Sequence, residues 1–301
     1  MSKAEEPKPW NNVMICLHPR HLVATLAVTA ICAAGATAQS TAPVAVINLE
    51  PYQDNPEFLT VRASVNGQAR TFAFDSGEGV SMISPELAQA IGCKPWGQVT
   101  GFRMNGERID APHCDDITFD AAGQHFRAPS VIVFDLMKFF KPGQPRLDGS
   151  LGFDLFADRA ITFEFSARSI VVESPASLAA RIASATEVPI RIVRDAEGLA
   201  LTVDIGVSTP EGMAWMELDS GGGNSIIIGK HIASLFKLDP ESKAMQQASF
   251  TVGGKIPVTA PARVMDHMIM DGNVNVPFLK KWDVTLDLAK GRAWVAPARR
   301  T

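Results

Sequence analysis

The sequence has no excess of charge of one sign and little that would suit a nucleic-acid or membrane partner. Lys and Arg number 28 against 32 Asp and Glu, a formal net charge of -4 over 301 residues. Without a broad cationic surface, neither nucleic acid nor an anionic membrane is expected as a partner. With 46% hydrophobic and 20% charged residues, the composition is globular and allows two cores of roughly 100 to 150 residues each.

Several catalytic motifs are also missing. The chain has no G-x-S-x-G turn for a serine nucleophile and no G-x-x-x-x-G-K-[ST] loop for phosphate. The histidines beyond the N-terminal segment lack the spacing of metal ligands. They are His113, His125, His231 and His267. Serine-nucleophile catalysis, phosphate binding and a metal centre are therefore not predicted.

An uncharged run stands near the N-terminus, from Leu22 to Ala38, after Arg20. Its basic start, apolar core and small final residues predict a signal peptide over residues 1–38 and export to the periplasm or secretion. Its length is marginal for spanning a bilayer, so an uncleaved anchor stays an alternative. After cleavage no stable membrane association is expected. Translation starts at Met1 or Met14.

Cysteine is scarce: the chain has four, and two of them lie in the predicted signal peptide. Cys93 and Cys114 remain. In an oxidising compartment they are candidates for a disulfide, which would stabilise the fold by roughly 3 kcal/mol. The alternative is two buried thiols that act as small hydrophobic residues.

Short runs of alternating or β-branched apolar residues dominate the rest and predict a mainly β protein. The expected strands are Phe58–Val65, Thr71–Phe74, Ser130–Phe134, Ile161–Phe165 and Ile170–Val172. Two short helices are expected at Pro85–Ile91 and Lys230–Leu238, each about ten residues after a D-S-G tripeptide. This parallel placement is the first sign of a duplication.

The duplication can be tested by sliding the sequence along itself. D-S-G-x-x-x-S occurs at Asp75 and again at Asp219, an offset of 144. The 25 residues from Asp148 align without a gap on those from Asp271, an offset of 123. The order of elements is the same in both halves. We predict lobes over residues 44–175 and 188–298, joined by a linker over residues 176–187.

Two aspartates in matching turns indicate a specific chemistry. Carboxylates about 3 Å apart cannot both ionise cheaply, so Asp75 and Asp219 would share one proton and supply an acid and a base together. The alternative is that each Asp only caps a tight turn. Asp148 and Asp271 form a second matching pair, but each precedes Gly and fits turn initiation.

Six residues around the two aspartates are predicted to support them. They are Ser76, Gly77, Ser81, Ser220, Gly221 and Ser225. The glycine in each turn permits close approach of the partner turn. The serine before it is expected to bond across to the opposite turn. The later serine, Ser81 or Ser225, is expected to reach the outer carboxylate oxygen.

The segments FAFDSGEGVSMIS and MELDSGGGNSIII resemble the paired active-site turns of pepsin-like and retropepsin-like aspartic peptidases, and DGSLGFDLF resembles a later motif of that family. The bacterial two-lobed retropepsin-like group is the most similar in style. The resemblance covers about residues 56–297. It implies an all-β, bilobal pepsin-like acid protease fold made of two retropepsin-like β-barrel lobes with short helices. It also implies an aspartic endopeptidase that needs no cofactor and acts, as a monomer, on peptide or unfolded protein.

The resemblance further implies a hairpin over the cleft. The candidate in the first lobe is Thr100–Glu107, with Gly101, Phe102 and Met104. Its counterpart in the second lobe is Thr251–Lys255, with Gly253 and Gly254.

Two departures from the family pattern bear on activity. The residue after D-S-G, usually Ala or Ser in the family, is Glu78 in the first lobe and Gly222 in the second. The glycine of the later motif is present as Gly152 but is replaced by Asn275. The alternative function is therefore a non-catalytic peptide-binding or scaffold protein on the same fold.

Overall fold

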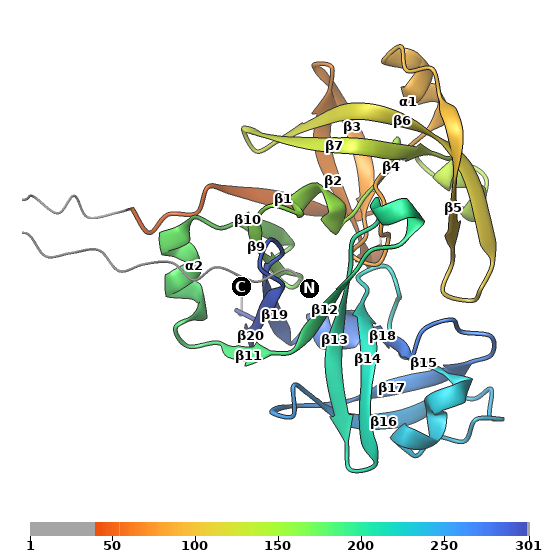
Figure 1. Cartoon of the computed structure of the whole chain (residues 1–301), viewed down its shortest axis with the longest axis vertical. Coiled ribbons are helices and arrows are strands. Elements are labelled where there is room, and N and C mark those ends of the chain that lie inside the picture. The colour runs from red at the N-terminus through yellow and green to blue at the C-terminus, as the bar shows by residue number, and fades with distance from the viewer. Residues whose placement is uncertain (1–39, 54, 300–301) are drawn as a thin grey trace, which may run out of the picture. The chain divides into compact units, whose positions relative to one another are not determined.

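The computed structural model describes residues 40–53 and 55–299, and the predicted signal peptide lies outside them. Their strands form one 13-stranded and one 7-stranded sheet. Figure 1 shows two groups of strands at opposite ends of the long axis, with a third group beside them. The mainly β prediction is confirmed.

The first lobe is built from seven strands: β2 (Asn55–Val65), β3 (Gln68–Phe74), β4 (Met82–Ile83), β5 (Trp96–Phe102), β6 (Arg108–Ala121), β7 (Gln124–Val133) and β8 (Gly149–Leu151). Their order is β2-β3-β8-β4-β7-β6-β5, and a further pairing of β2 with β6 curls the sheet toward a barrel. The pairings β3–β8 and β4–β7 are parallel, whereas the rest are antiparallel.

The second lobe has a matching set of strands: β12 (Ile190–Val193), β13 (Thr202–Thr209), β14 (Gly212–Leu218), β15 (Ile226–Gly229), β16 (Gln246–Val252), β17 (Ile256–Met265) and β18 (Gly272–Val274). Here too the strand that leads into D-S-G, β14, runs parallel to the strand of the later motif, β18. A pairing of β13 with β16 corresponds to that of β2 with β6. Apart from β5 in the first lobe and β12 in the second, the strands of the two lobes therefore share one topology.

Six strands join the lobes: β1 (Ala45–Tyr52), β9 (Ala160–Glu164), β10 (Ser169–Val172), β11 (Thr186–Val188), β19 (Trp282–Asp287) and β20 (Arg292–Pro297). β9 pairs with β19, so that Thr162 lies opposite Thr285 with their hydroxyl oxygens 2.9 Å apart. These two residues are related by the offset of 123 that the sequence predicts. A pseudo-two-fold axis therefore passes between them.

Three short α-helices and four 3-10 helices complete the described part: α1 (Pro85–Ala90), α2 (Pro175–Ile182), α3 (Val276–Leu279), η1 (Leu136–Phe139), η2 (Phe153–Phe156), η3 (Ala196–Gly198) and η4 (Lys230–Phe236). α1 confirms its prediction, because the Ser84 side chain accepts from Leu87 N and proline occupies the first turn. The second predicted helix is the 3-10 helix η4. α2 and β11 occupy the predicted linker, and the lobe boundaries stay a prediction.

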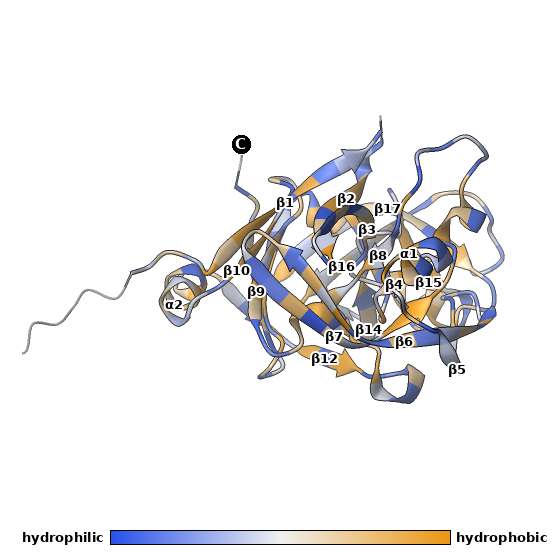
Figure 2. Ribbon diagram, turned by 90° about the horizontal axis from the view of Figure 1, so that it is seen from above, coloured by the Kyte–Doolittle hydropathy of each residue, from blue (hydrophilic) through white to orange (hydrophobic). Residues whose placement is uncertain are grey.

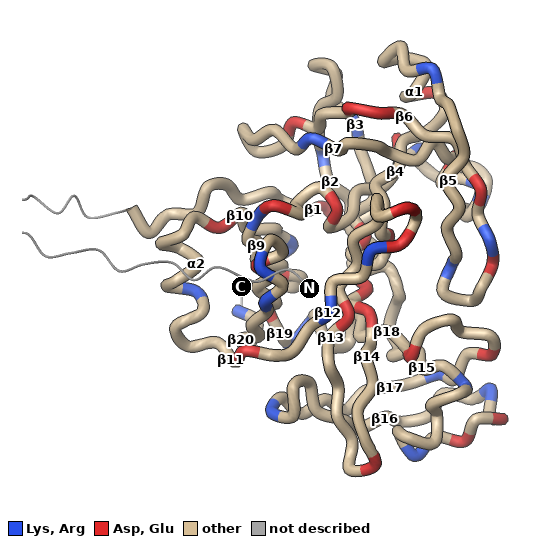
Figure 3. The backbone as a smooth tube through the Cα atoms, in the orientation of Figure 1, with Lys and Arg blue, Asp and Glu red and all other residues tan. Residues whose placement is uncertain are grey.

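The core consists mainly of residues that point inward from the strands of both lobes and the joining sheet. Its largest fully buried side chains include Phe72, Phe119, Phe153, Phe163 and Phe278. Figure 2 shows hydrophobic residues along the strands, with hydrophilic residues frequent in the loops. Figure 3 shows both signs of charge spread over both lobes. Within residues 40–53 and 55–299, no helix is long and apolar enough to cross a membrane.

Candidate active site

The two predicted aspartates stand at equivalent points, each directly after the strand that leads into a D-S-G turn. Asp75 follows β3, and its backbone N donates to Leu151 O of β8 at 3.1 Å. Asp219 follows β14, and its backbone N donates to Val274 O of β18, also at 3.1 Å. Each parallel strand pair thus fixes where its aspartate leaves the sheet.

The serines of the two turns bond across to one another. Ser76 N donates to Ser220 Oγ at 3.0 Å, and Ser220 N donates to Ser76 Oγ at 2.9 Å. Ser76 Oγ donates in turn to Leu218 O at 2.7 Å. Both serines are buried. Because buried hydrogen bonds of this kind are costly to break, they hold the two turns in one relative position.

The glycines let each aspartate lie against the opposite turn. A Cβ on Gly221 would lie 2.7 Å from Asp75 Cγ, and one on Gly77 would lie 3.0 Å from Asp219 Cγ. Gly221 N donates to Asp219 Oδ1 at 2.8 Å and to Asp75 Oδ1 at 3.2 Å. Gly77 N donates to Asp75 Oδ1 at 2.9 Å. Side chains larger than hydrogen would separate the two carboxyl groups.

The two carboxyl groups influence each other's ionisation. Burial raises the pKa of Asp75, whereas the hydrogen bonds from the backbone N of Gly77 and of Gly221 lower it by less. Burial, followed by the nearby charge of Asp75, raises the pKa of Asp219. The interaction between the two carboxyl groups lowers the pKa of Asp75 and raises that of Asp219. An acid pair with raised pKa values retains one proton over a range of pH in which separate aspartates would both be ionised.

Ser81 and Ser225 do not reach the two aspartates, which corrects the role predicted for them. Ser81 Oγ donates to Asp154 Oδ1 at 2.7 Å and accepts from Gly152 N at 3.0 Å. Ser225 Oγ instead accepts from Arg263 Nε at 3.1 Å.

The physical reason is a difference in register between the lobes. In the first lobe Met82 lies opposite Ser150, whereas in the second Ile227 lies opposite Asn273. Met82 and Ile227 are 145 residues apart in sequence, whereas the two aspartates are 144 apart. The second turn is thus one residue longer, and Ser225 is not the spatial counterpart of Ser81.

The two departures from the family pattern fill equivalent space. In the first lobe, a Cβ on Gly152 would lie 3.4 Å from Glu78 Cβ, so the glycine leaves room for the glutamate. In the second lobe, a Cβ on Gly222 would lie 2.9 Å from the amide nitrogen of Asn275. Asn275 Nδ2 donates to Ser225 O at 2.6 Å. In the first lobe the large residue follows D-S-G and the glycine lies in the later motif. In the second lobe the glycine follows D-S-G and the large residue lies in the later motif.

Glu78 is a third carboxyl beside the pair. Burial raises the pKa of Glu78 well above its usual range. The charge of Asp75 is the next largest cause. Its Oε1 is buried and has no hydrogen-bond partner among the described residues. A neutral Glu78 adds no charge to the pair.

Three further polar residues near the pair were missed by the sequence analysis. Asn273 donates to Asp219, Asp154 accepts from Ser81, and Glu217 is buried on β14. Burial raises the pKa of Asp154 to about 6. Burial, followed by the charge of Asp219, raises that of Glu217 well above the usual range. Only Glu217 could have been found from the sequence. It stands two residues before Asp219, and residues two apart on a strand share a face.

The two hairpin candidates lie in different surroundings. β5 and β6 form a hairpin in which Phe102 lies opposite Arg108 and is 61% exposed. Its turn reaches the second lobe, where Ile269 N donates to Met104 O at 3.1 Å. The β16–β17 turn contains Gly253, which donates to Gly206 O at 2.8 Å and packs on Val188. The structure therefore does not support a lid role for Gly253 and Gly254, whereas Gly101, Phe102 and Met104 lie in a hairpin that bridges the lobes.

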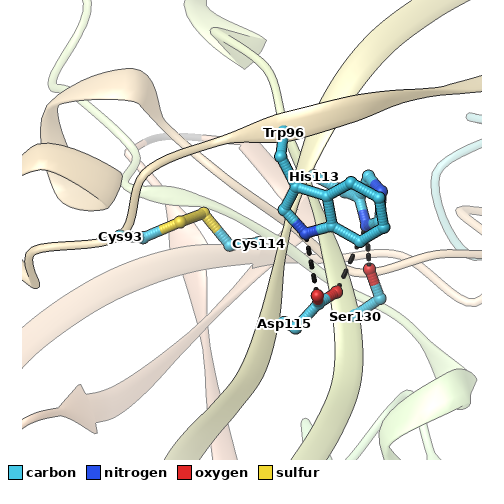
Figure 4. The surroundings of a disulfide bond; sticks show 6 residues. All are labelled: Cys93, Trp96, His113, Cys114, Asp115 and Ser130. Carbon is cyan, nitrogen blue, oxygen red and sulfur yellow. Dashed lines mark hydrogen bonds and ion pairs between the residues drawn. A yellow bond between two sulfur atoms is a disulfide. The ribbon is translucent and has the colours of Figure 1, made fainter.

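Cys93 and Cys114 form a disulfide at the base of that first hairpin, with their Cα atoms 6.2 Å apart. Figure 4 shows His113, Asp115 and Ser130 beside it, the residue types of a nucleophilic triad. Ser130 Oγ and Asp115 Oδ1 both contact the same nitrogen of His113, Nδ1, at 2.6 and 3.3 Å. A triad needs one ring nitrogen for each partner, so this group is structural.

No metal site stands out near the aspartates. In the part of the chain that the structure describes, no three His, Cys, Asp or Glu side chains form a group that could hold a metal ion.

Comparisons with known proteins agree with this geometry. Residues 61–155, which include the first D-S-G turn, match the family model described as Aspartyl protease. No curated protein matches the chain. Among solved structures, the crystal structure of Basic 7S globulin from soybean is similar with a TM-score of 0.51 and 9% identity, over 84% of this chain and 94% of that one. At that identity the likeness concerns the fold alone. The first lobe therefore matches the aspartyl protease family, and the chain has the pepsin-like aspartic protease fold.

Proposed function

We propose that this protein is an aspartic endopeptidase that hydrolyses peptide bonds with water held between Asp75 and Asp219. The observation that supports it best is the pair of D-S-G turns, bonded to each other through Ser76 and Ser220 so that the carboxyl groups of Asp75 and Asp219 shift each other's pKa. A turn-capping role alone would not require two such turns to meet.

The chemistry needs only these two groups. The ionised carboxyl takes a proton from water as the water oxygen bonds to the carbonyl carbon of the substrate. The protonated carboxyl gives its proton to the carbonyl oxygen. The resulting gem-diol then collapses with protonation of the leaving amine. Raised pKa values keep one proton on the pair at the start of this cycle.

The substrate proposed is an extended peptide or unfolded protein. Such a chain would lie between the lobes, under the β5–β6 hairpin, whose turn contacts the second lobe at Ile269. We further propose that the protein is exported to the periplasm or secreted through residues 1–38 and acts as a monomer without a cofactor. The Cys93–Cys114 disulfide supports an oxidising compartment.

The test uses the mature chain and denatured casein between about pH 3 and about pH 8. Wild type should cleave, and Asp75→Asn and Asp219→Asn should each lose about 100-fold or more in kcat/KM, because acid-base catalysis contributes at least that much. Ser225→Ala is a matched control in the same turn. If all four proteins behave alike, the proposal is wrong.

A second candidate function is non-catalytic binding of extended peptides on the same fold. It is favoured by Glu78 and Glu217, two buried carboxyls beside the pair that peptide hydrolysis does not use. A statine-type inhibitor separates the two functions, since its hydroxyl occupies the place of the attacking water. Tight binding together with casein cleavage supports the peptidase. Peptide binding without cleavage and without inhibitor affinity supports the second candidate.

A further inference from the structure

The place beside each aspartate differs chemically between the two lobes. Ala73 stands two residues before Asp75 on β3, and Glu217 stands two residues before Asp219 on β14. Residues two apart on a strand share a face, so each of them lies on the side of the sheet that carries its aspartate. Ala73 pairs with a residue of β8 and Glu217 with the matching residue of β18, so the two are spatial counterparts.

In the first lobe this place is apolar. Ala73 is buried with Tyr52 and Leu147, and four partly buried side chains pack against them. These are Phe58, Leu136, Met137 and Phe140, and we call the seven residues the apolar cluster. The rings of Tyr52, Phe58 and Phe140 meet edge to face with their centroids 5.5 to 5.6 Å apart. A charged group placed here would lose its contacts with water, so the apolar cluster suits an apolar substrate residue.

In the second lobe the same place is acidic. Asp204 of β13 lies directly opposite Glu217, and Thr202 stands two residues before Asp204 on the same face. Thr202 is the counterpart of Phe58, because β13 pairs with β14 as β2 pairs with β3. Glu217 is 6% exposed, whereas Thr202 and Asp204 are half-buried, so these three residues reach the surface. We call them the acidic group.

The charges that act on Glu217 are negative. Burial raises its pKa most, and nearby acids raise it further, in order of effect Asp219, Asp75 and Asp204. Burial raises the pKa of Asp204 to about 6, with the charges of Asp271 and Asp195 adding to the effect and Arg191 opposing it. A buried carboxyl among other acids ionises readily only when a cation comes close to it. The acidic group therefore suits a positively charged partner.

We propose that Glu217 is a specificity-determining residue that selects a lysine or arginine side chain on one side of the cleaved bond, while the apolar cluster takes an apolar residue on the other side. The inference rests on the proposed function and adds the substrate class to it; Glu217 takes no part in the chemical step. Successive side chains of an extended peptide point in opposite directions, so the residues on either side of the bond face different lobes. The long stems of lysine and arginine carry their charge to a recessed acid.

The test measures binding without turnover, by calorimetry with peptides whose central bond is replaced by an uncleavable hydroxyethylene group. Three peptides differ only at the two central residues, which are leucine–leucine, leucine–lysine or lysine–leucine. One of the two lysine peptides should bind wild type about 100-fold more tightly than the leucine peptide, because it supplies the cation for a buried acid. Glu217→Gln should lose this preference, and Glu217→Leu should prefer the leucine peptide. Glu211→Gln, at an exposed position of the β13–β14 turn, is the control and should retain the wild-type preference.

The pH dependence of binding gives a second measurement. Glu217 should release its proton to solvent as the cation arrives, so the ratio of lysine-peptide to leucine-peptide affinity should rise as pH increases from about 5 to about 8. Glu217→Gln should show a constant ratio. Taking the ratio removes the ionisation of Asp75 and Asp219, which both peptides meet alike.

Equal binding of all three peptides by wild type overturns the inference, and this comparison needs no variant. A lysine preference that survives in Glu217→Gln, with near-ultraviolet circular dichroism showing an intact fold, overturns it as well. Casein cleavage by wild type without any lysine preference counts against the inference alone. Lysine-selective binding that depends on Glu217, without casein cleavage, counts against the proposed function alone.

Discussion

The two lobes place an aspartate at the same point of the same strand arrangement, yet they surround it differently. The first lobe has Glu78 beside Gly152, and a serine, Ser81, bonded to a buried carboxyl. The second lobe has Gly222 beside Asn275, together with an asparagine bonded to the aspartate itself. The shared topology thus fixes the position of the acids, whereas the residues around them set how each acid ionises. Substitutions in equivalent positions should separate these two contributions.

The largest difference between the lobes should come from the turn glycines. A methyl group on Gly221 would overlap the Asp75 carboxyl, whereas one on Gly77 would meet Asp219 at a longer distance. Gly221→Ala should therefore lose about 100-fold or more in kcat/KM and about 3 kcal/mol in the free energy of unfolding. Gly77→Ala should lose only about ten-fold in kcat/KM. Casein cleavage and urea unfolding provide the measurements. Equal losses would mean that each glycine lies equally close to the aspartate of the opposite turn.

The disulfide distinguishes the hairpin of the first lobe from that of the second, which has no cysteine. Removing it by the double change Cys93→Ser and Cys114→Ser should lower the free energy of unfolding by about 3 kcal/mol, because the cross-link limits the unfolded chain over a separation of 21 residues. Thermal unfolding with and without reductant tests this. Reductant should lower the Tm of wild type and leave that of the double variant unchanged.

Asp154 has no carboxyl counterpart in the second lobe, where the aligned residue is Pro277. Its pKa of about 6 lies above the ordinary value of 3.8, so the folded state favours its protonated form. This contribution to stability is present below about pH 4 and is lost as pH rises toward about 6.

Asp154→Asn, which stays neutral, should therefore gain about 2 kcal/mol relative to wild type between about pH 4 and about pH 7. Urea unfolding at the two pH values measures the change. Asp116→Asn, at an exposed position, is the control. A pH-independent difference between Asp154→Asn and wild type would show that the carboxyl is ionised throughout.

The smallest effect concerns the exchanged pair of large and small residues. Gly152→Asn alone should destabilise the first lobe by about 2 kcal/mol, since its side chain would meet both Glu78 and Asp154. Adding Glu78→Gly should recover about 1 kcal/mol beyond additivity, because it copies the arrangement of the second lobe. A double-mutant cycle by urea unfolding measures the coupling. Strict additivity would mean that the two positions are independent.

Much of the fold could be predicted from local patterns. The alternation of apolar residues predicted β2, β3, β7, β9 and β10 in part or whole, and a short helix was predicted at Pro85–Ile91, where α1 lies. The aspartates and the cross-bonded serines were named from the repeated tripeptide. These features depend on neighbours in sequence, or on an offset that can be counted.

The surroundings of the aspartates could not be predicted in the same way. A single extra residue in the second turn removes Ser225 from the place of Ser81, and only strand register reveals it. Asn273 reaches Asp219 across 54 residues of chain, on a strand that gives no sign of chemistry. Glu78 and Asn275 look like independent departures from the family pattern until the space beside Gly152 and Gly222 is measured. Each of these facts is a contact between segments far apart in sequence.

The pairing of β9 with β19 also affects how the candidate site depends on protein concentration. Because both halves belong to one chain and are joined through this pairing, each half meets the other at an effective concentration of about millimolar. Assembly of the two D-S-G turns is therefore an intramolecular event. Dilution that would separate two independent subunits leaves the pair of aspartates intact, so specific activity should remain constant down to very low protein concentrations.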